Sequence, residues 1–519
     1  MFAVIKKIIY LFCLIIILPD SPTGTEAAGR IGMSYLWLDE EGNQSLSHNT
    51  YNVYDGWGLS LEDIRLVFGN NIRLTADLKN ITLDNRHLDL TLRQPGQFNI
   101  RLFNRQYRRI YDAGNNVFTR RKQSGIALTA IPRKYLTFFG DGTYTSKSGL
   151  TTSLGETSEF APPHAIDYDQ ISFKTGVNLA AHGRMIQVEY HYTDYEEENY
   201  LSDNQTRHFN RVRGILPIPG REWIVLSGRY EYFKTKYDNT RRFLRVNSGH
   251  VGMSLKFPDH LTFSYAFYID DIHSGINSKN IDNIAHNISL GYIRPGILAA
   301  TGGLRYDLRD EEDAASKGLT YYLSARYTPR RAFEFRLKYG GRRQDLDRGL
   351  RLLGERTRDR FQIRGVFRKD RWGSLTAGFE KRHRTNDLIG SESNYDRSSI
   401  DLEVFLTDHG AMTGGYAFSV GDYDNVENNF EFHNHVIHAD LAWRDIENLS
   451  LSAGLWYIRG KRDIDLDRLT MRFSGSYRIW REYTIEIKYN VYNIDDYLTI
   501  DAYHTANLIR LELTREFSL

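Results

Sequence analysis

Apolar and polar side chains alternate along nearly the whole of this 519-residue chain. Residues 333–339 read FEFRLKY, which places the aromatic and aliphatic side chains on one face and the charges on the other. A period of two indicates a β-strand, because successive side chains of a strand point to opposite faces. Further examples lie at residues 72–78, 185–190, 400–405 and 485–489. The sequence therefore predicts an all-β fold whose strands each have one apolar face.

Short turn signals separate these alternating segments, and many contain Gly, Pro, Asn or Asp, which adopt the backbone angles of tight turns. The turns are predicted at residues 69–71, 94–96, 132–133, 181–183, 217–220, 258–260, 294–296, 329–331, 369–371, 408–410, 445–447 and 480–482. Longer polar segments separate consecutive turns. Examples are residues 146–167, 196–207, 270–282, 310–317, 384–394 and 421–433.

This order of short turn, strand, long polar segment and strand is the layout of an outer-membrane barrel, with short periplasmic turns and longer extracellular loops. The turns, one strand near residues 30–38 and one near 506–519 predict a single large transmembrane antiparallel β-barrel of about 26 strands. Residues 511–519 alternate to the last residue and resemble the C-terminal assembly signal of such barrels. A soluble solenoid or propeller is the alternative fold, but the chain has no fixed-length repeat.

The N-terminus has the pattern of a secretory signal peptide. Lys6 and Lys7 precede an apolar run over residues 8–18, and the small residues Ala27 and Ala28 follow. The run is too short to span about 30 Å of hydrocarbon. We therefore expect residues 1–28 to be a cleaved signal peptide and residues 29–519 to form a barrel in the bacterial outer membrane. Cys13, the single cysteine, lies within the apolar run, so the mature chain would contain none.

Composition and motifs narrow the classes of function. The net charge of +2 gives no long-range attraction for nucleic acid, so that partner is not expected. The 34 Tyr residues suit a membrane interface, where one end of the side chain is apolar and the other is wet. The chain has no nucleophile elbow, phosphate-binding Gly-rich loop or zincin motif. We expect no enzyme, and we assign no catalytic or cofactor-binding residue.

Two groups of side chains resemble incomplete metal sites. Glu431, His433 and His435 share one strand face with His438 nearby, and such ligands bind Zn or Cu. Three acids with alternating spacing present the oxygen ligands that Ca²⁺ prefers. They are Asp463, Asp465 and Asp467. The first group lacks a fourth ligand, so a solvated loop leading into a strand is favoured there. The second lacks an EF-hand glycine and a terminal Glu, so a wet loop or the lumen wall is favoured, and no metal site is predicted. The acidic run at residues 310–313 is expected in an exposed loop that binds cations weakly.

Arginines cluster in the sequence. The early cluster is Arg105, Arg108, Arg109, Arg120 and Arg121, and later pairs are Arg330-Arg331 and Arg342-Arg343. Other strand cations share a face with acids, as in the group Arg364, Arg368, Glu380 and Arg382. A charged face inside a barrel is either wet or packed against a polar partner. The mixed signs argue against a strongly anion-selective pore and fit a solvated wall, a lumen packed with charge pairs, or a lumen that holds another protein.

A barrel of this size encloses a lumen wide enough for a folded protein or a polymer, so it needs an occupant or a gate. Alternation begins near the expected cleavage site, so we expect no plug domain within the chain.

Three stretches carry a family resemblance: residues 88–96 (LDLTLRQPG), 107–112 (YRRIYD) and 140–144 (GDGTY). With the strand number, they resemble the decahaem-cytochrome-associated outer-membrane barrels of porin–cytochrome conduits, although the cysteine pair of some members is absent. The resemblance implies a porin-like sheath that holds a multihaem cytochrome for electron transfer across the membrane. Its partners would be membrane lipid and periplasmic and extracellular cytochromes, with haem only on the partner. The alternatives are a general or gated porin for polar solutes and an exporter of polysaccharide or lipopolysaccharide.

Overall fold

The computed structural model describes residues 26–518 apart from 113–115, 152–163, 200–203, 239, 241, 276–278, 312–313, 347–356, 387–389, 425–428, 447 and 498–501. The predicted signal peptide therefore lies almost wholly outside the described residues. The short 3₁₀ turns η1 (Gln44–Leu46), η2 (Gly69–Asn71) and η4 (Pro258–His260) precede or separate strands. Among the described residues, no helix has the length and apolar character needed to cross a membrane.

Antiparallel β-strands make up nearly all of the described chain. They are β1 (Glu26–Gly42), β2 (Gly56–Phe68), β3 (Ile72–Lys79), β4 (His87–Gln94), β5 (Phe98–Ile110), β6 (Phe118–Arg133), β7 (Leu136–Thr151), β8 (His164–Ala181), β9 (Arg184–Glu197), β10 (Gln205–Ile218), β11 (Arg221–Tyr237), β12 (Phe243–Lys256), β13 (Leu261–Ser274), β14 (Lys279–Arg294), β15 (Leu298–Glu311), β16 (Ala314–Arg330), β17 (Phe333–Leu346), β18 (Thr357–Lys369), β19 (Gly373–Asn386), β20 (Ser391–Phe405), β21 (Gly410–Asp424), β22 (Asn429–Ile446), β23 (Leu449–Arg462), β24 (Leu466–Trp480), β25 (Tyr483–Asp496) and β26 (Tyr503–Ser518).

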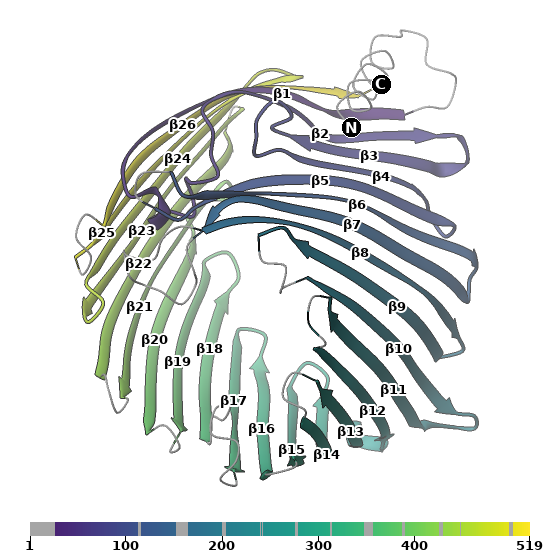
Figure 1. The fold of residues 1–519 in the computed structure, drawn as a ribbon. Helices are drawn as coiled ribbons and strands as arrows, with labels where there is room; N and C mark the ends of the chain where they lie inside the picture. The colour runs from purple at the N-terminus through teal and green to yellow at the C-terminus, as the bar shows by residue number, and fades with distance from the viewer. Residues whose placement is uncertain are drawn as a thin grey trace.

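The 26 strands form one closed barrel (Figure 1). Each strand pairs with the next along the chain, and β1 closes the sheet by pairing with β26 from Ala28 opposite Ser518 to Gly42 opposite His504. Closure leaves no unpaired sheet edge, which is what a sheet in lipid requires. The predicted fold class and strand number are confirmed.

The predicted tight turns lie at junctions between consecutive strands, although several overlap the end of the preceding strand; residues 132–133, for example, are the last two of β6, and residue 447 lies outside the described residues. The loops within the predicted long polar segments are shorter than expected, because the strands extend into these segments. Residues 310–317 were expected to form a loop, yet β15 and β16 stay paired as far as Glu311 opposite Ala314. Similarly, β21 and β22 pair up to Asp424 opposite Asn429. Polar side chains at these positions do not end a strand, because a two-stranded ladder beyond the bilayer still satisfies its backbone hydrogen bonds.

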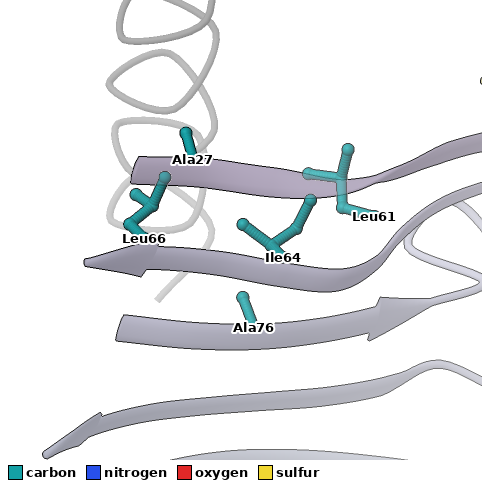
Figure 2. Close-up of a cluster of buried hydrophobic side chains, with 5 residues drawn as sticks. All are labelled: Ala27, Leu61, Ile64, Leu66 and Ala76. Atoms are coloured by element: carbon teal, nitrogen blue, oxygen red, sulfur yellow. The ribbon is translucent and has the colours of Figure 1, made fainter. Parts of the chain in front are cut away.

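A hydrophobic cluster packs β1, β2 and β3 together (Figure 2). It consists of Ala27, Leu61, Ile64, Leu66 and Ala76, and Ile64 is fully buried. Gly29 lies at a register shift of β1 against β2, where a Cβ would lie 2.5 Å from Ile64 Cδ1. The absence of a side chain at Gly29 therefore lets Ile64 pack against the neighbouring strand.

Residues 43–55 cover a gap in the barrel wall beside the end of β5. The sequence did not predict this arrangement. β3 and β4 are eight residues each, so β5 has no β4 partner beyond Arg105. There the backbone N–H of Arg108 donates to Asn52 Oδ1 at 2.7 Å, and Arg108 Nε donates to the carbonyl of Tyr51 at 2.9 Å. The Arg108 guanidinium also lies 4.5 Å from the ring centre of Tyr54, whose pKa is raised by burial. The segment thus supplies the wall contacts that the short hairpin lacks.

Candidate functional site: the lumen wall

The register of the strands assigns each side chain to the outside or the lumen. In β17, Phe333, Phe335 and Tyr339 are well exposed on the apolar face, while Glu334 between them is 2 % exposed. In lipid the apolar face must point outward, so Glu334 and the residues in phase with it face the lumen. Residues directly opposite in an antiparallel pair share a face, which extends this assignment from strand to strand around the barrel.

The lumen face of β16 to β20 forms a basic wall. Its cations are Arg326, Arg336, Lys338, Arg342, Arg358, Arg360, Arg364, Arg368, Arg382, Arg384 and Arg397. Its carboxylates are Glu334, Glu380, Asp401 and Glu403. The predicted shared face of Arg364, Arg368, Glu380 and Arg382 is present. On the lumen face of these five strands cations outnumber acids by more than two to one, so the near-neutral chain concentrates positive charge on this part of the lumen wall.

Glu334 is the most buried acid of the basic wall. Its Oε2 lies 2.7 Å from Arg326 Nη2 and 3.6 Å from Arg368 Nη1, and Arg336 Nε donates to its Oε1. Glu380 plays the same part nearer the extracellular end, where Arg360 Nε and Arg382 Nε lie within 2.8 Å of Oε1. Each acid joins arginines from neighbouring strands and partly neutralises them.

Arginines also face one another directly across strands on the basic wall. Arg326, Arg336 and Arg364 form one row nearer the periplasmic end, and a second row lies nearer the extracellular end. The second row consists of Arg342, Arg358 and Arg384. Like charges directly opposite destabilise a sheet, so the fold keeps these rows at a cost in stability. Positions that break a local rule at a cost in stability are expected at functional or strained sites.

The early arginine cluster is divided between the two faces. Arg105, Arg109 and Arg121 lie in phase with the lumen residues, whereas Arg108 and Arg120 are opposite each other on the outward face. Arg342 and Arg343 are likewise separated by the strand alternation. Proximity in sequence therefore overstated the local concentration of charge, and the cross-strand register created the rows that sequence spacing did not reveal.

The candidate zinc ligands do not converge. His433 and His435 lie on the outward face with Glu431, whereas His438 faces the lumen beside Trp456. His435 Nδ1 is 2.8 Å from Tyr416 Oη, and His433 Nε2 is 3.2 Å from Glu431 Oε1.

The aspartates with alternating spacing bind donor groups of the protein itself. Asp463 Oδ2 accepts the backbone N–H of Glu431 at 2.5 Å, while Asp465 and Asp467 both pair with Arg459. Of the run at 310–313, Glu312 and Asp313 lie outside the described residues. In the part of the chain that the structure describes, no group of three metal-binding side chains is assembled.

Comparison with known proteins gives a fold and no close relative. No protein-family model and no curated protein matches the sequence. The siderophore receptor PirA from Pseudomonas aeruginosa has a TM-score of 0.50 at 12% identity, over 82% of each chain. The copper transporter OprC has a TM-score of 0.51 at 8% identity, over 96% of this chain and 82% of its own. A double mutant of the ferric enterobactin receptor PfeA from Pseudomonas aeruginosa has a TM-score of 0.53 at 10% identity, over 95% and 81%.

The chain is a bacterial outer-membrane β-barrel. Its apolar outward face contacts membrane lipid, as predicted. We expected no enzyme, and these neighbours are themselves named as receptors and a transporter.

The comparisons correct the expected function. The resemblance to decahaem-cytochrome-associated barrels, and with it the cytochrome sheath and the cytochrome partners, was wrong: the solved structures that share the fold are receptors and transporters named for siderophores and copper. The alternatives of a porin and a polysaccharide or lipopolysaccharide exporter also find no support in them. The residues behind the resemblance, such as the turn at 94–96, follow from barrel geometry alone, because any tight β-hairpin selects Pro and Gly there.

Proposed function

We propose that this protein transports an anionic ligand across the outer membrane along the basic wall of its lumen. The observation that carries the proposal is the excess of arginine on the lumen face of β16 to β20. A surface of one sign raises the local concentration of oppositely charged ligands and speeds their capture. The two arginine rows lie six residues apart along β17, about 20 Å at the rise of a strand. An anion released by one row would meet the next.

An anionic metal chelate is the ligand class that we propose. The three similar structures are named for a siderophore, ferric enterobactin and copper, which supports metal uptake as the task of this fold. Guanidinium groups bind carboxylate-type oxygens in pairs of parallel hydrogen bonds, so the rows suit a chelate with acidic groups on its surface.

The test is uptake of radioactive iron chelates by a bacterial strain that produces this protein and lacks other chelate transporters. We expect uptake of an anionic chelate to exceed that of a cationic chelate of similar size. Replacing Lys338, Arg364 and Arg397 by Glu should abolish the preference without loss of folded protein. The matched control is Lys381→Glu, because Lys381 pairs with Asp396 across the outward face. Equal uptake of both chelates, or loss of preference in the control, would overturn the proposal.

A further inference from the structure

A small pocket opens in the lumen wall of β13 to β17, toward the extracellular end. Its volume is about 160 Å³, and its polar lining includes Arg305, Asp307, Arg309 and Arg342. The pocket exists because β16 places small residues, Ser316 and Gly318, between arginine-bearing strands. Opposite Gly318 lie Asp307 on β15 and Gln344 on β17.

Cations outnumber carboxylates in the lining of the pocket. Arg305 Nε donates to Asp307 Oδ1 at 2.8 Å, which balances one guanidinium. Arg309 and Arg342 add two further cations, and Asp307 is the single carboxylate among the described lining residues. Arg342 also begins the extracellular arginine row, with Arg358 directly opposite. The pocket therefore adjoins the basic wall at Arg342.

The other side of the pocket is apolar. Ile272 and Ile281 are directly opposite each other on β13 and β14 and line the same cavity. A cavity of about 150 Å³ holds a benzene molecule, so this one fits a single ring or short aliphatic frame and no complete chelate. Arginines at one end and isoleucines at the other match a group that is anionic at one end only.

We propose that this pocket binds a carboxylate or phenolate group carried on a small apolar frame, as one arm of the anionic ligand. The inference rests on the proposed transport function and deepens it by naming the chemistry that the wall recognises. The guanidinium fork of Arg342 holds the oxygens, and Ile272 and Ile281 contact the frame. The remainder of the ligand lies in the lumen against Arg358.

The experiment is isothermal titration of the purified full-length barrel with benzoate as the probe. We expect Arg342→Gln to weaken benzoate binding at least about tenfold, because the neutral amide cannot replace the charge-assisted hydrogen bonds of the guanidinium fork. The matched control is Arg343→Gln, the next residue on the opposite face, which should bind as the wild type does. Gly318→Val should also abolish binding by filling the cavity, since a Cβ there meets Asp307 Cβ at 3.6 Å without a clash.

Each outcome is decisive. Equal binding by wild type and Arg342→Gln overturns the inference, as does binding of inorganic phosphate with none of benzoate, because the apolar side then has no part. A gel shift on heating shows that each variant is folded. If Arg342→Gln binds benzoate normally while the uptake preference for anionic chelates persists, the pocket fails and the transport proposal stands. If benzoate binding depends on Arg342 but the uptake preference for anionic chelates is absent, the transport proposal fails and the pocket stands.

Discussion

Replacing Glu334 by Gln tests how the basic wall is stabilised. Glu334 is 2 % exposed and contacts three guanidinium groups, whose side chains are 58%, 43% and 49% exposed. Breaking a fully buried ion pair costs about 3–5 kcal/mol, while a pair in water is worth under about 1 kcal/mol. Since the acid is buried and its partners are half in water, we expect the variant to lose about 2 kcal/mol of unfolding free energy.

The assay is reversible urea unfolding of the barrel in lipid vesicles, followed by tryptophan fluorescence. The matched control is Glu486→Gln on the lumen face of β25. Glu486 has Lys488 as an ion-pair partner at 2.8 Å, and the lysine is 42% exposed, so a loss below about 0.5 kcal/mol is expected. Added salt should reduce the deficit of Glu334→Gln by screening the arginines. If that variant unfolds within about 0.5 kcal/mol of the wild type, the Glu334 account is refuted.

Three further predictions address other parts of the barrel. Gly29→Ala should cost about 1–3 kcal/mol, measured by urea unfolding, because a Cβ meets Ile64 Cδ1 at 2.5 Å; wild-type stability would show that the bulge has no packing role. Arg108→Ala should expose residues 43–55 to protease added to cells, with lumen-facing Arg109→Ala as control; equal resistance would disprove the wall contact. His435→Ala should leave the zinc content unchanged, as measured by mass spectrometry. Loss of stoichiometric zinc would contradict the conclusion that these histidines do not form a zinc site.

The number and direction of strands could be predicted because turn chemistry and alternation are local. The turns at residues 69–71 and 258–260 need no knowledge of the rest of the chain, since Asn, Gly, Asp and Pro favour their backbone angles. Loop lengths were less predictable. At residues 310–317 the sequence is polar in either case, and only pairing with the neighbouring strand decides whether it stays extended.

The candidate site depended on register, which a single sequence does not contain. The common face of Arg364 and Arg368 followed from their spacing, but the rows that bring Arg336 opposite Arg364 and Arg342 opposite Arg358 are cross-strand facts. The mixed signs of the sequence also concealed the basic wall, because acids on the outward face, such as Asp359 and Asp396, balance the total. The pocket beside Gly318 could not be predicted either, because its lining residues come together only through the cross-strand register.

Thiol labelling along β17 tests the central claim that the lumen is basic. Single cysteines replace Lys338 and Gly340 in the lumen and Leu337 and Tyr339 outside, in a chain whose natural cysteine, Cys13, is mutated. Each folded barrel in lipid is treated with a sulfonate-bearing and then a trimethylammonium-bearing thiosulfonate. The account predicts labelling at 338 and 340 alone. At these two positions the ratio of anionic to cationic labelling should be several-fold higher than the same ratio for free cysteine. Labelling at 337 and 339, or a preference for the cationic reagent in the lumen, would contradict it.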